Sequence, residues 1–436
     1  MPSPRLIPAL AKLLAVALTL LAALSPPRLL PAQERPPGAA RPHIVVIVSD
    51  DAGYADFSVN GAQDIRTPRI DSIAAAGVRC SDGYVSGCVC SPSRAGLLTG
   101  RYQQRFGHEF NIPPRYSETN GLPLSERTIA DELARAGYRT VALGKWHLGY
   151  ADEFHPLSRG FANYFGFLQG ARSYFPLKKA TRLNRLLRDR EVQVESFDYM
   201  TDELGRQAAR YIEGRGDEPL FLYIAYNAVH TPMHAMKGDL EGLDGKARRR
   251  KLVAMTHALD RSVGYVLDAL AREDILDDTL VCFVNDNGGA TNNSSRNGVL
   301  RGRKGQLFEG GIRVPFFMQW PNGLPKGRVC RDPIIALDLL PTFLAAAGIV
   351  RDGGADLDGV DLLPFLRGEA VADAVPHDRL YWRSGSKRAV RQGRWKLVWP
   401  AAGDAMLFDL GADVGESRDL AAEDPKRVAA LTAHYE

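Results

Sequence analysis

The sequence has few cysteines, no long apolar run beyond its first residues and no marked excess of charge of either sign. Its 436 residues include five cysteines, an odd number that is too small for a disulfide framework. At least one cysteine is therefore free, modified or paired with another chain. After the first residues, no apolar run approaches the about 20 residues that span a bilayer. We expect a soluble globular protein whose leftover cysteine has a specific use.

The first residues have the layout of a secretory signal peptide. Arg5 and Lys12 precede an apolar stretch over residues 13–24, which is shorter than a membrane span and is followed by prolines. No cysteine lies nearby, which argues against a lipid anchor. We predict a signal peptide at 1–33, a linker at 34–41, and a periplasmic or secreted protein without a stable membrane anchor.

The charge balance gives no reason to expect a nucleic-acid partner. The whole chain has 55 basic and 51 acidic residues and a formal net charge of +4. Residues 1–33 hold three of the basic residues and no acidic one, which leaves 52 basic against 51 acidic residues without them. A nearly neutral chain lacks the electrostatic footprint of a nucleic-acid-binding protein.

Strand and helix patterns alternate up to about residue 350. Mostly apolar stretches, typical of strands buried on both faces, lie at 43–48, 138–143, 219–226 and 279–284, with a further strand expected at 313–320. Helical patterns lie at 67–76, 126–136, 202–212, 246–272 and 334–347. This alternation predicts an α/β catalytic domain at 42–352, in which helices sandwich a large, doubly wound, mostly parallel sheet.

Two other regions differ from this pattern. Residues 150–200 have little periodicity, and we expect an irregular, substrate-facing excursion there. Beyond about residue 353, short strand patterns are followed by a helix that begins near Pro425. They predict a small C-terminal α+β subdomain at 353–436, an antiparallel sheet with one packed helix.

Polar side chains follow four of the predicted strands directly. They are Asp50 and Asp51, Lys145 and His147, His230, and Asp286 and Asn287, in the order of the strands. The carboxyl ends of parallel strands share one edge of a sheet, where ligands bind. An Asp pair alone would be read as a solvated turn. Three carboxylates and an amide oxygen instead favour a hard divalent cation, Ca²⁺ or Mg²⁺, over zinc.

The stretch Cys90-Ser91-Pro92-Ser93-Arg94 is typical of a loop that turns into a helix at Cys90. Free N–H groups at a helix start favour an anion, and Arg94 adds a cation one turn on. Taken alone, the pattern also fits a buried structural cysteine. Together with Lys145, His147, His230 and Lys304, it describes a pocket for a tetrahedral dianion with an in-line nucleophile.

These motifs resemble those of the sulfatases of the alkaline phosphatase superfamily, over nearly the whole chain from Pro42 to about Leu420. The stretch from Cys90 to Gly100 matches the motif whose cysteine a separate maturation enzyme oxidises to Cα-formylglycine. Gly144-Lys145-Trp146-His147-Leu148-Gly149 is a second match. Further matches, in the family's order, are Ser49–Gly53, His230–Pro232, Asp286–Gly288 and Gly302–Gly305.

The resemblance implies hydrolysis of a sulfate ester, with a sulfated small molecule or carbohydrate as substrate, through a covalent intermediate on formylglycine 90. It implies Ca²⁺, with Mg²⁺ as the alternative, held by Asp50, Asp51, residue 90, Asp286 and Asn287. Lys304 and His230 would contact the ester and leaving-group oxygens. His147 would take the proton that allows release of sulfate. Arg94 and Lys145 would hold the hydroxyl and the oxygens on the metal side.

Other functions stay open from the residues alone. Phosphodiesterases and phosphonate monoester hydrolases share this scaffold, and a sulfated-glycan binder would keep Cys90 as a thiol. A Ca²⁺-binding structural protein would not need the lysines and histidines of the pocket. Basic residues at 178–190 and 246–251 are most simply solvated, with a polyanionic ligand as the alternative.

Overall fold

The computed structural model describes residues 41–436. The predicted signal peptide, and the predicted linker apart from Arg41, lie outside the described residues. In the described part of the chain, no helix has both the length and the apolar character needed to cross a membrane.

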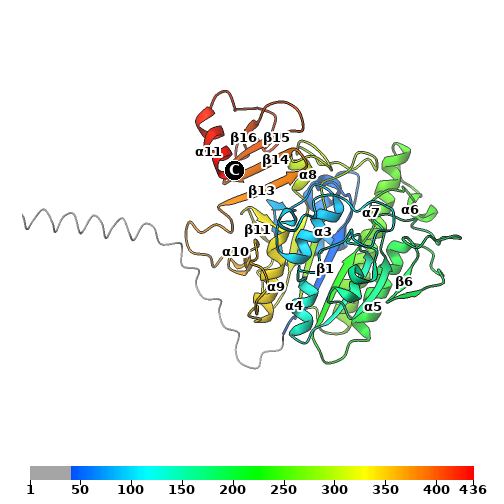
Figure 1. Ribbon diagram of the computed structural model, residues 1–436. Helices are drawn as coiled ribbons and strands as arrows, with labels where there is room; N and C mark the ends of the chain where they lie inside the picture. The colour runs from blue at the N-terminus through cyan, green and yellow to red at the C-terminus, as the bar shows by residue number, and fades with distance from the viewer. Residues whose placement is uncertain (1–40) are drawn as a thin grey trace, which may run out of the picture. The chain divides into compact units, whose positions relative to one another are not determined.

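A ten-stranded sheet is the central element of the described chain (Figure 1). Its order is β11-β2-β10-β9-β1-β8-β4-β5-β6-β7, and the run from β9 to β5 is parallel. The strands are β1 (His43–Ser49), β2 (Val78–Cys80), β4 (Arg139–Lys145), β5 (Asn163–Phe167), β6 (Leu187–Arg188), β7 (Glu191–Val192), β8 (Leu220–Ala225), β9 (Thr279–Asn285), β10 (Phe316–Gln319) and β11 (Arg328–Cys330). The predicted mostly parallel sheet is thus confirmed.

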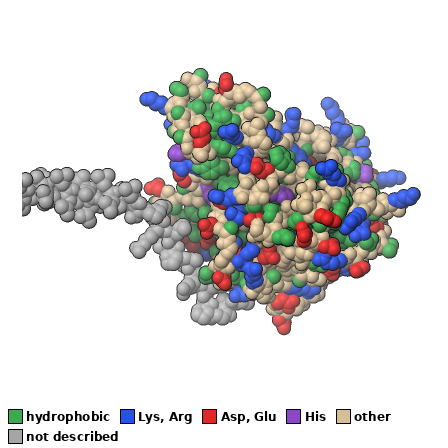
Figure 2. Space-filling view, viewed as in Figure 1, with side chains coloured by type: hydrophobic (Ala, Val, Ile, Leu, Met, Phe, Trp, Pro, Cys, Tyr) green, Lys and Arg blue, Asp and Glu red, His purple; other side chains and the backbone are tan. Residues whose placement is uncertain are grey.

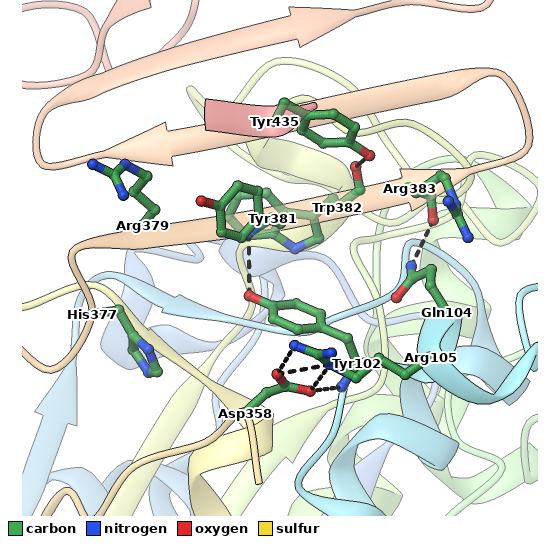
Figure 3. A pocket seen from close by; sticks show the side chains of 10 residues that line it. All are labelled: Tyr102, Gln104, Arg105, Asp358, His377, Arg379, Tyr381, Trp382, Arg383 and Tyr435. Carbon is green, nitrogen blue, oxygen red and sulfur yellow. Dashed lines mark hydrogen bonds and ion pairs between the residues drawn. The ribbon is translucent and has the colours of Figure 1, made fainter. Parts of the chain in front are cut away.

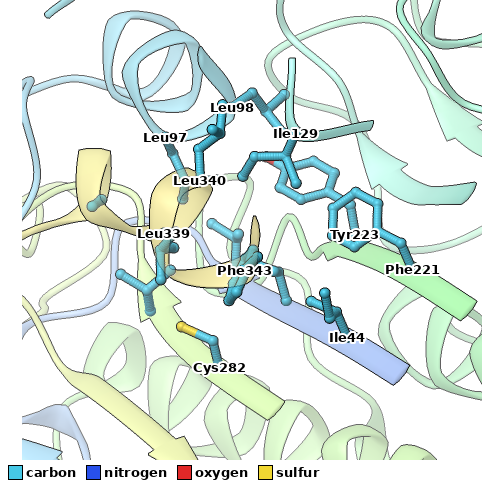
Figure 4. Close-up of a cluster of buried hydrophobic side chains, with 14 of the residues drawn as sticks. Ile44, Leu97, Leu98, Ile129, Phe221, Tyr223, Cys282, Leu339, Leu340 and Phe343 are labelled. Carbon is cyan, nitrogen blue, oxygen red and sulfur yellow. The ribbon is translucent and has the colours of Figure 1, made fainter. Parts of the chain in front are cut away.

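Helices cover both faces of this sheet. One face packs against α3 (Cys90–Thr99), α4 (Ile129–Arg135), α9 (Leu339–Ala347) and α10 (Leu363–Arg367), and the other against α2 (Pro68–Ala76), α5 (Met200–Glu213) and α7 (Ala247–Arg272). Alternate side chains of β1 supply the two cores: Ile44 and Val46 face the first set of helices, and Val45 and Ile47 the second. Figure 4 shows the first core, where side chains of α3 and α9 meet those of β1, β8 and β9. The doubly wound arrangement is confirmed.

Three predicted elements have different bounds in the structure. Helix α4 begins after Thr128 rather than at Glu126, because the Thr128 hydroxyl caps the Asp131 amide at 3.1 Å. Strand β10 begins only after Pro315, which has no N–H to donate to a neighbouring strand. The expected helix at 334–347 is divided into a short strand, β12 (Ile334–Ile335), a 3₁₀ turn at 336–338, and α9. Pro341 lies in the first turn of α9, where its missing N–H is tolerated.

The excursion at 150–200 contains more regular structure than expected. It includes β5, a buried parallel neighbour of β4, and the short antiparallel strands β6 and β7. The sequence pattern missed β5 because its five residues are Tyr, Phe, Gly and Asn and include no aliphatic run. Its substrate-facing role stays a prediction.

The C-terminal part forms a separate antiparallel sheet with one helix, as predicted. The strands, in the order of the sheet, are β13 (Arg379–Ser384), β14 (Lys387–Gln392), β15 (Trp395–Trp399) and β16 (Met406–Asp409), and the helix is α11 (Pro425–Tyr435). The short elements also include β3 (Gly83–Tyr84), which pairs with β12, the helices α6 (Lys237–Leu240) and α8 (Glu309–Ile312), and several 3₁₀ turns. The boundaries of the two predicted domains stay predictions.

A crevice of about 570 Å³ lies beside edge strand β13 (Figure 3). The Tyr381 amide donates to the Tyr102 hydroxyl at 3.2 Å, and Gln104 Nε2 donates to the Arg383 carbonyl at 2.9 Å. These side chains satisfy part of the open edge of the small sheet.

Charged side chains of both signs are interspersed over the face of the molecule seen in Figure 2. This mixture matches the near neutrality calculated from the sequence, and no single sign dominates the view.

Candidate active site

The predicted polar residues meet at one edge of the large sheet. Strands β9, β1, β8 and β4 are consecutive neighbours, and Ser49 is paired with Asn285 in register. The two residues that follow β1 therefore leave the sheet beside the two that follow β9. The amide of Asp51 donates to Asp286 Oδ1 at 3.3 Å, which connects the two loops.

Asp50 is buried next to Lys145, Cys90, Arg94 and Asp286, all of which the sequence predicted as site residues. Lys145 Nζ donates to Asp50 Oδ2 at 2.5 Å, and Cys90 Sγ lies 3.6 Å from Asp50 Oδ1. Burial raises the pKa of Asp50, and the negative charge of Asp286 adds to the rise, whereas Lys145 opposes it. The lysine thus offsets part of the cost of keeping this carboxylate out of water.

Asp286 is matched by a second buried cation. Arg94, from the first turns of α3, donates to Asp286 Oδ2 from Nε at 3.1 Å and from Nη2 at 2.9 Å. Burial would raise the pKa of Asp286, but Arg94 and the neighbouring lysines outweigh it and lower the pKa to about 2. Asp286 is therefore ionised at neutral pH.

Asp51 is buried, but two of its neighbours, Lys304 and His230, are partly exposed to solvent. Lys304 Nζ lies 2.6 Å from Asp51 Oδ1, and Asn287 Nδ2 donates to the same oxygen at 2.8 Å. His230 Nε2 lies 3.5 Å from Asp51 Oδ2. The Lys304 and His230 side chains are 19% and 17% exposed, whereas those of Arg94 and Lys145 have no exposed surface. The cations thus form an outer pair and a buried pair.

Cys90 is the first residue of α3, as the sequence predicted, and it is buried. Lys304 Nζ lies 3.2 Å from Cys90 Sγ. Burial raises the pKa of the Cys90 thiol to about 12, with Lys145 opposing the rise, so an unmodified Cys90 is protonated at neutral pH. The protein groups around Cys90 therefore favour the neutral thiol over the thiolate.

The same residues fit a divalent cation. Asp50, Asp51, Cys90 and His230 each offer one atom, and these atoms lie within 4.8 Å of one another. Asn287 Oδ1 is buried and has no hydrogen-bond donor. A buried carbonyl oxygen without a partner is costly, and a hard cation would satisfy it. The identity of the ion and the ligand roles stay predictions. From the sequence we expected His230 to contact the substrate, whereas the structure also places it among the possible metal ligands.

His147 lies two residues after the end of β4, close in sequence to Lys145, and forms no hydrogen bond with Cys90. Its Nε2 lies 3.4 Å from the Ile112 carbonyl, and its Nδ1 is buried without a partner. Burial lowers the pKa of His147 well below its ordinary value, and Lys145 and Arg94 lower it further. His147 is therefore neutral at pH 7.

Sequence reasoning missed several residues that hold the site in place. Asn293 Nδ2 donates to the carbonyls of Asp51 at 3.0 Å and Val229 at 3.1 Å. The Tyr174 hydroxyl donates to the His230 carbonyl at 2.8 Å. Both residues lie in segments without periodicity, and the sequence offered no signal for either beyond its type.

Comparison with known families matches the chain twice. Residues 42–349 match the family described as sulfatase, and residues 303–434 match that described as N-sulphoglucosamine sulphohydrolase, C-terminal. The first match alone covers more than half of the chain and includes all the candidate site residues.

Several curated proteins and solved structures are similar over most of the chain. Arylsulfatase J of Mus musculus is 33% identical over 83% of this chain, which spans 64% of that protein's length. N-acetylgalactosamine-6-sulfatase of Canis lupus familiaris is 31% identical over 85% of this chain and 74% of its own. The crystal structure of Ps i-CgsB in complex with k-i-k-neocarrahexaose has a TM-score of 0.85 and 35% identity, over 90% of this chain and 92% of its own. These findings confirm the resemblance seen in the motifs, and the chain belongs to the sulfatase family of hydrolases.

Proposed function

We propose that this protein hydrolyses a sulfate ester of a carbohydrate to an alcohol and inorganic sulfate. The observation that carries the proposal is the position of Cys90 at the start of α3, where its Sγ lies 3.6 Å from Asp50 Oδ1 and 3.2 Å from Lys304 Nζ. Support for a carbohydrate comes from the relative named N-acetylgalactosamine-6-sulfatase and from the neocarrahexaose complex of Ps i-CgsB.

Two groups that the family uses would complete this site. Cα-formylglycine, made from Cys90 by a maturation enzyme, would supply as its hydrate the two hydroxyls needed for attack on sulfur and for release of sulfate. Ca²⁺ or Mg²⁺ would supply positive charge beside them, held by the oxygens of Asp50, Asp51, Asp286 and Asn287 and by residue 90.

The two pairs of cations have different tasks in this proposal. Lys304 and His230 are partly exposed, so they bind the sulfate and leaving-group oxygens of the substrate and supply a proton to the leaving alcohol. Arg94 and Lys145 are wholly buried and hold Asp286 and Asp50 in place. We thus revise the role expected for Arg94 and Lys145 from holding the hydroxyl and the oxygens on the metal side to positioning the two carboxylates.

We assign the step that releases sulfate to His147. Donation from His147 Nε2 to the Ile112 carbonyl leaves the lone pair of Nδ1 free. A neutral imidazole with a free nitrogen is suited to take the proton of the second hydroxyl at residue 90.

Cys90→Ala tests the proposal most directly. We expect the release of sulfate from sulfated oligosaccharides, measured by ion chromatography, to fall at least about 1,000-fold, because no other group replaces the nucleophile. Cys282→Ala is the matched control, since Cys282 is a buried cysteine in the core of β9. Near-native turnover by Cys90→Ala would refute the mechanism.

The alternatives predict different outcomes on the same preparation. A phosphodiesterase or phosphonate monoester hydrolase would turn over bis(4-nitrophenyl) phosphate far faster than 4-nitrophenyl sulfate, and we expect the reverse. A glycan binder would keep residue 90 as a thiol in peptide mass spectrometry after expression with a maturation enzyme. We expect the mass of formylglycine there.

We further propose that the protein is exported to the periplasm or secreted. The support is the basic start and apolar stretch within residues 1–33. Deleting residues 2–33 should leave the protein in the cytoplasmic fraction on immunoblotting, and unchanged export would contradict the proposal.

A further inference from the structure

The basic cluster at residues 246–251 divides into paired and unpaired cations in the structure. Arg249 is buried and lies 2.5 Å from Asp56 and 2.7 Å from Asp64. Arg250 donates to the Leu240 carbonyl at 3.2 Å. Arg248 and Lys251, by contrast, are exposed, and neither forms an ion pair with any described carboxylate. Three residues apart on α7, they lie on the same side of the helix.

Arg248 and Lys251 line a cavity of about 560 Å³, part of whose wall follows the candidate site residue His230 in the chain. Its other lining residues are Thr231, Pro232, Met233, His234, Ala247 and Asn292. The cavity wall thus begins at the residue that follows His230. It also includes the neighbour of Asn293, whose side chain donates to the carbonyl of Asp51. The cavity and the catalytic centre are built on the same two loops.

The cavity carries positive charge without a compensating carboxylate in its lining. The first turn of α7 contains no acidic residue, and no side chain caps it. Two cations at the positive end of a helix are unfavourable unless an anion binds there. The positive charge of Lys251 also reaches His234, because it adds to the effect of burial in lowering the pKa of that imidazole.

We propose that Arg248 and Lys251 bind a second anionic group, a sulfate or a carboxylate, on the same carbohydrate whose sulfate ester is hydrolysed at residue 90. The proposal rests on the proposed function and narrows it to substrates with at least two anionic groups. The guanidinium of Arg248 offers two parallel donors to such a group, and Lys251 adds a point charge. Thr231, His234 and Asn292 provide polar contacts along the same wall.

The test compares one galactose-containing disaccharide in its monosulfated and disulfated forms. We expect the ratio of kcat/KM for the disulfated over the monosulfated form to fall about tenfold in Arg248→Ala and in Lys251→Ala, and further in the double variant. Arg248→Lys should keep part of the preference. Lys246→Ala is the matched control, since it removes an exposed cation of the same cluster that does not line the cavity.

Each outcome separates this inference from the proposed function. An active double variant that keeps the wild-type ratio would overturn the anion subsite and leave the sulfatase proposal standing. If the wild-type protein released no sulfate from either form, the proposed function would fail instead. Calorimetry of Cys90→Ala with the disulfated disaccharide then tests the subsite alone. Affinity unchanged by adding Arg248→Ala and Lys251→Ala would refute it.

Discussion

At the scale of single residues, the buried pair of Arg94 and Asp286 connects α3 to the loop after β9. Neither side chain is more than 1% exposed, and two hydrogen bonds join them. Removing one partner leaves the other as an uncompensated buried charge. We predict that Arg94→Ala lowers the free energy of unfolding by about 3 kcal/mol, measured by urea denaturation at pH 7.

Arg105→Ala is the control for this prediction. Arg105 also pairs with an aspartate, Asp358, at 2.7 Å, but its side chain is 57% exposed. An exposed pair contributes under about 1 kcal/mol, because water solvates both charges when they separate. Equal losses in the two variants would mean that burial of the Arg94 pair does not matter for stability.

At the scale of elements, a buried ionic cluster joins the small C-terminal sheet to α8. Lys396 of β15 lies 2.8 Å from Glu309 of α8 and 2.9 Å from Glu416, and all three side chains are fully buried. Burial would raise the pKa of Glu309, but Lys396 and two arginines outweigh it and lower it to about 2. Burial raises the pKa of Glu416 to about 7, against the opposing effect of Lys396. One lysine thus faces two carboxylates with different affinities for a proton.

Glu416 should make the stability of the protein depend on pH. The folded state holds the Glu416 proton more tightly than the unfolded state, in which its pKa is near the ordinary value of 4.5. The free energy of unfolding therefore falls as the pH rises from about 4.5 through about 7. The glutamine of the Glu416→Gln variant cannot ionise. We therefore expect the free energy of unfolding to fall between pH 5 and pH 8 by about 2 kcal/mol less in this variant than in the wild-type chain, measured by urea denaturation at each pH.

Glu423→Gln provides the comparison, because its carboxylate is 57% exposed and pairs with an exposed arginine. Its pH profile should match that of the wild-type chain. If Glu416→Gln also followed the wild-type profile, the buried cluster would not be the source of the pH dependence.

The elements that the sequence predicted best are those whose pattern is local. Mostly apolar stretches identified the four strands, and the parallel topology then required Asp50 and Asp286 to share an edge. Ion pairs between residues far apart in the sequence could not be predicted. The sequence could not distinguish Arg249, which is bound to Asp56, from Arg248, which has no such partner, because the partner lies almost 200 residues away. Likewise, the sequence could not show which cations of the site are buried, because their burial depends on how α3 and β4 pack.

At the scale of the whole molecule, the small C-terminal sheet shares a hydrophobic core with residues from the first 352 positions of the chain. Trp382 of β13 packs against Tyr84 with ring centroids 5.3 Å apart, and its indole donates to the Val85 carbonyl at 2.8 Å. Phe408 of β16 meets Phe308 in the same cluster. Neither part covers this apolar surface alone, so the two should unfold together.

Truncation after Asp352 tests whether the predicted domain at 42–352 can exist by itself. The fragment would expose Tyr84, Phe308 and their neighbours and leave Glu309 without Lys396. We expect a single calorimetric transition for the whole chain and no cooperative transition for the fragment. Truncation after Asp424 removes only α11, which places one fully buried residue, Leu431, against the sheet, so that chain should keep one transition at a lower Tm. A fragment that melted cooperatively within a few degrees of the whole chain would show instead that the large domain folds independently and that the shared core contributes little to its stability.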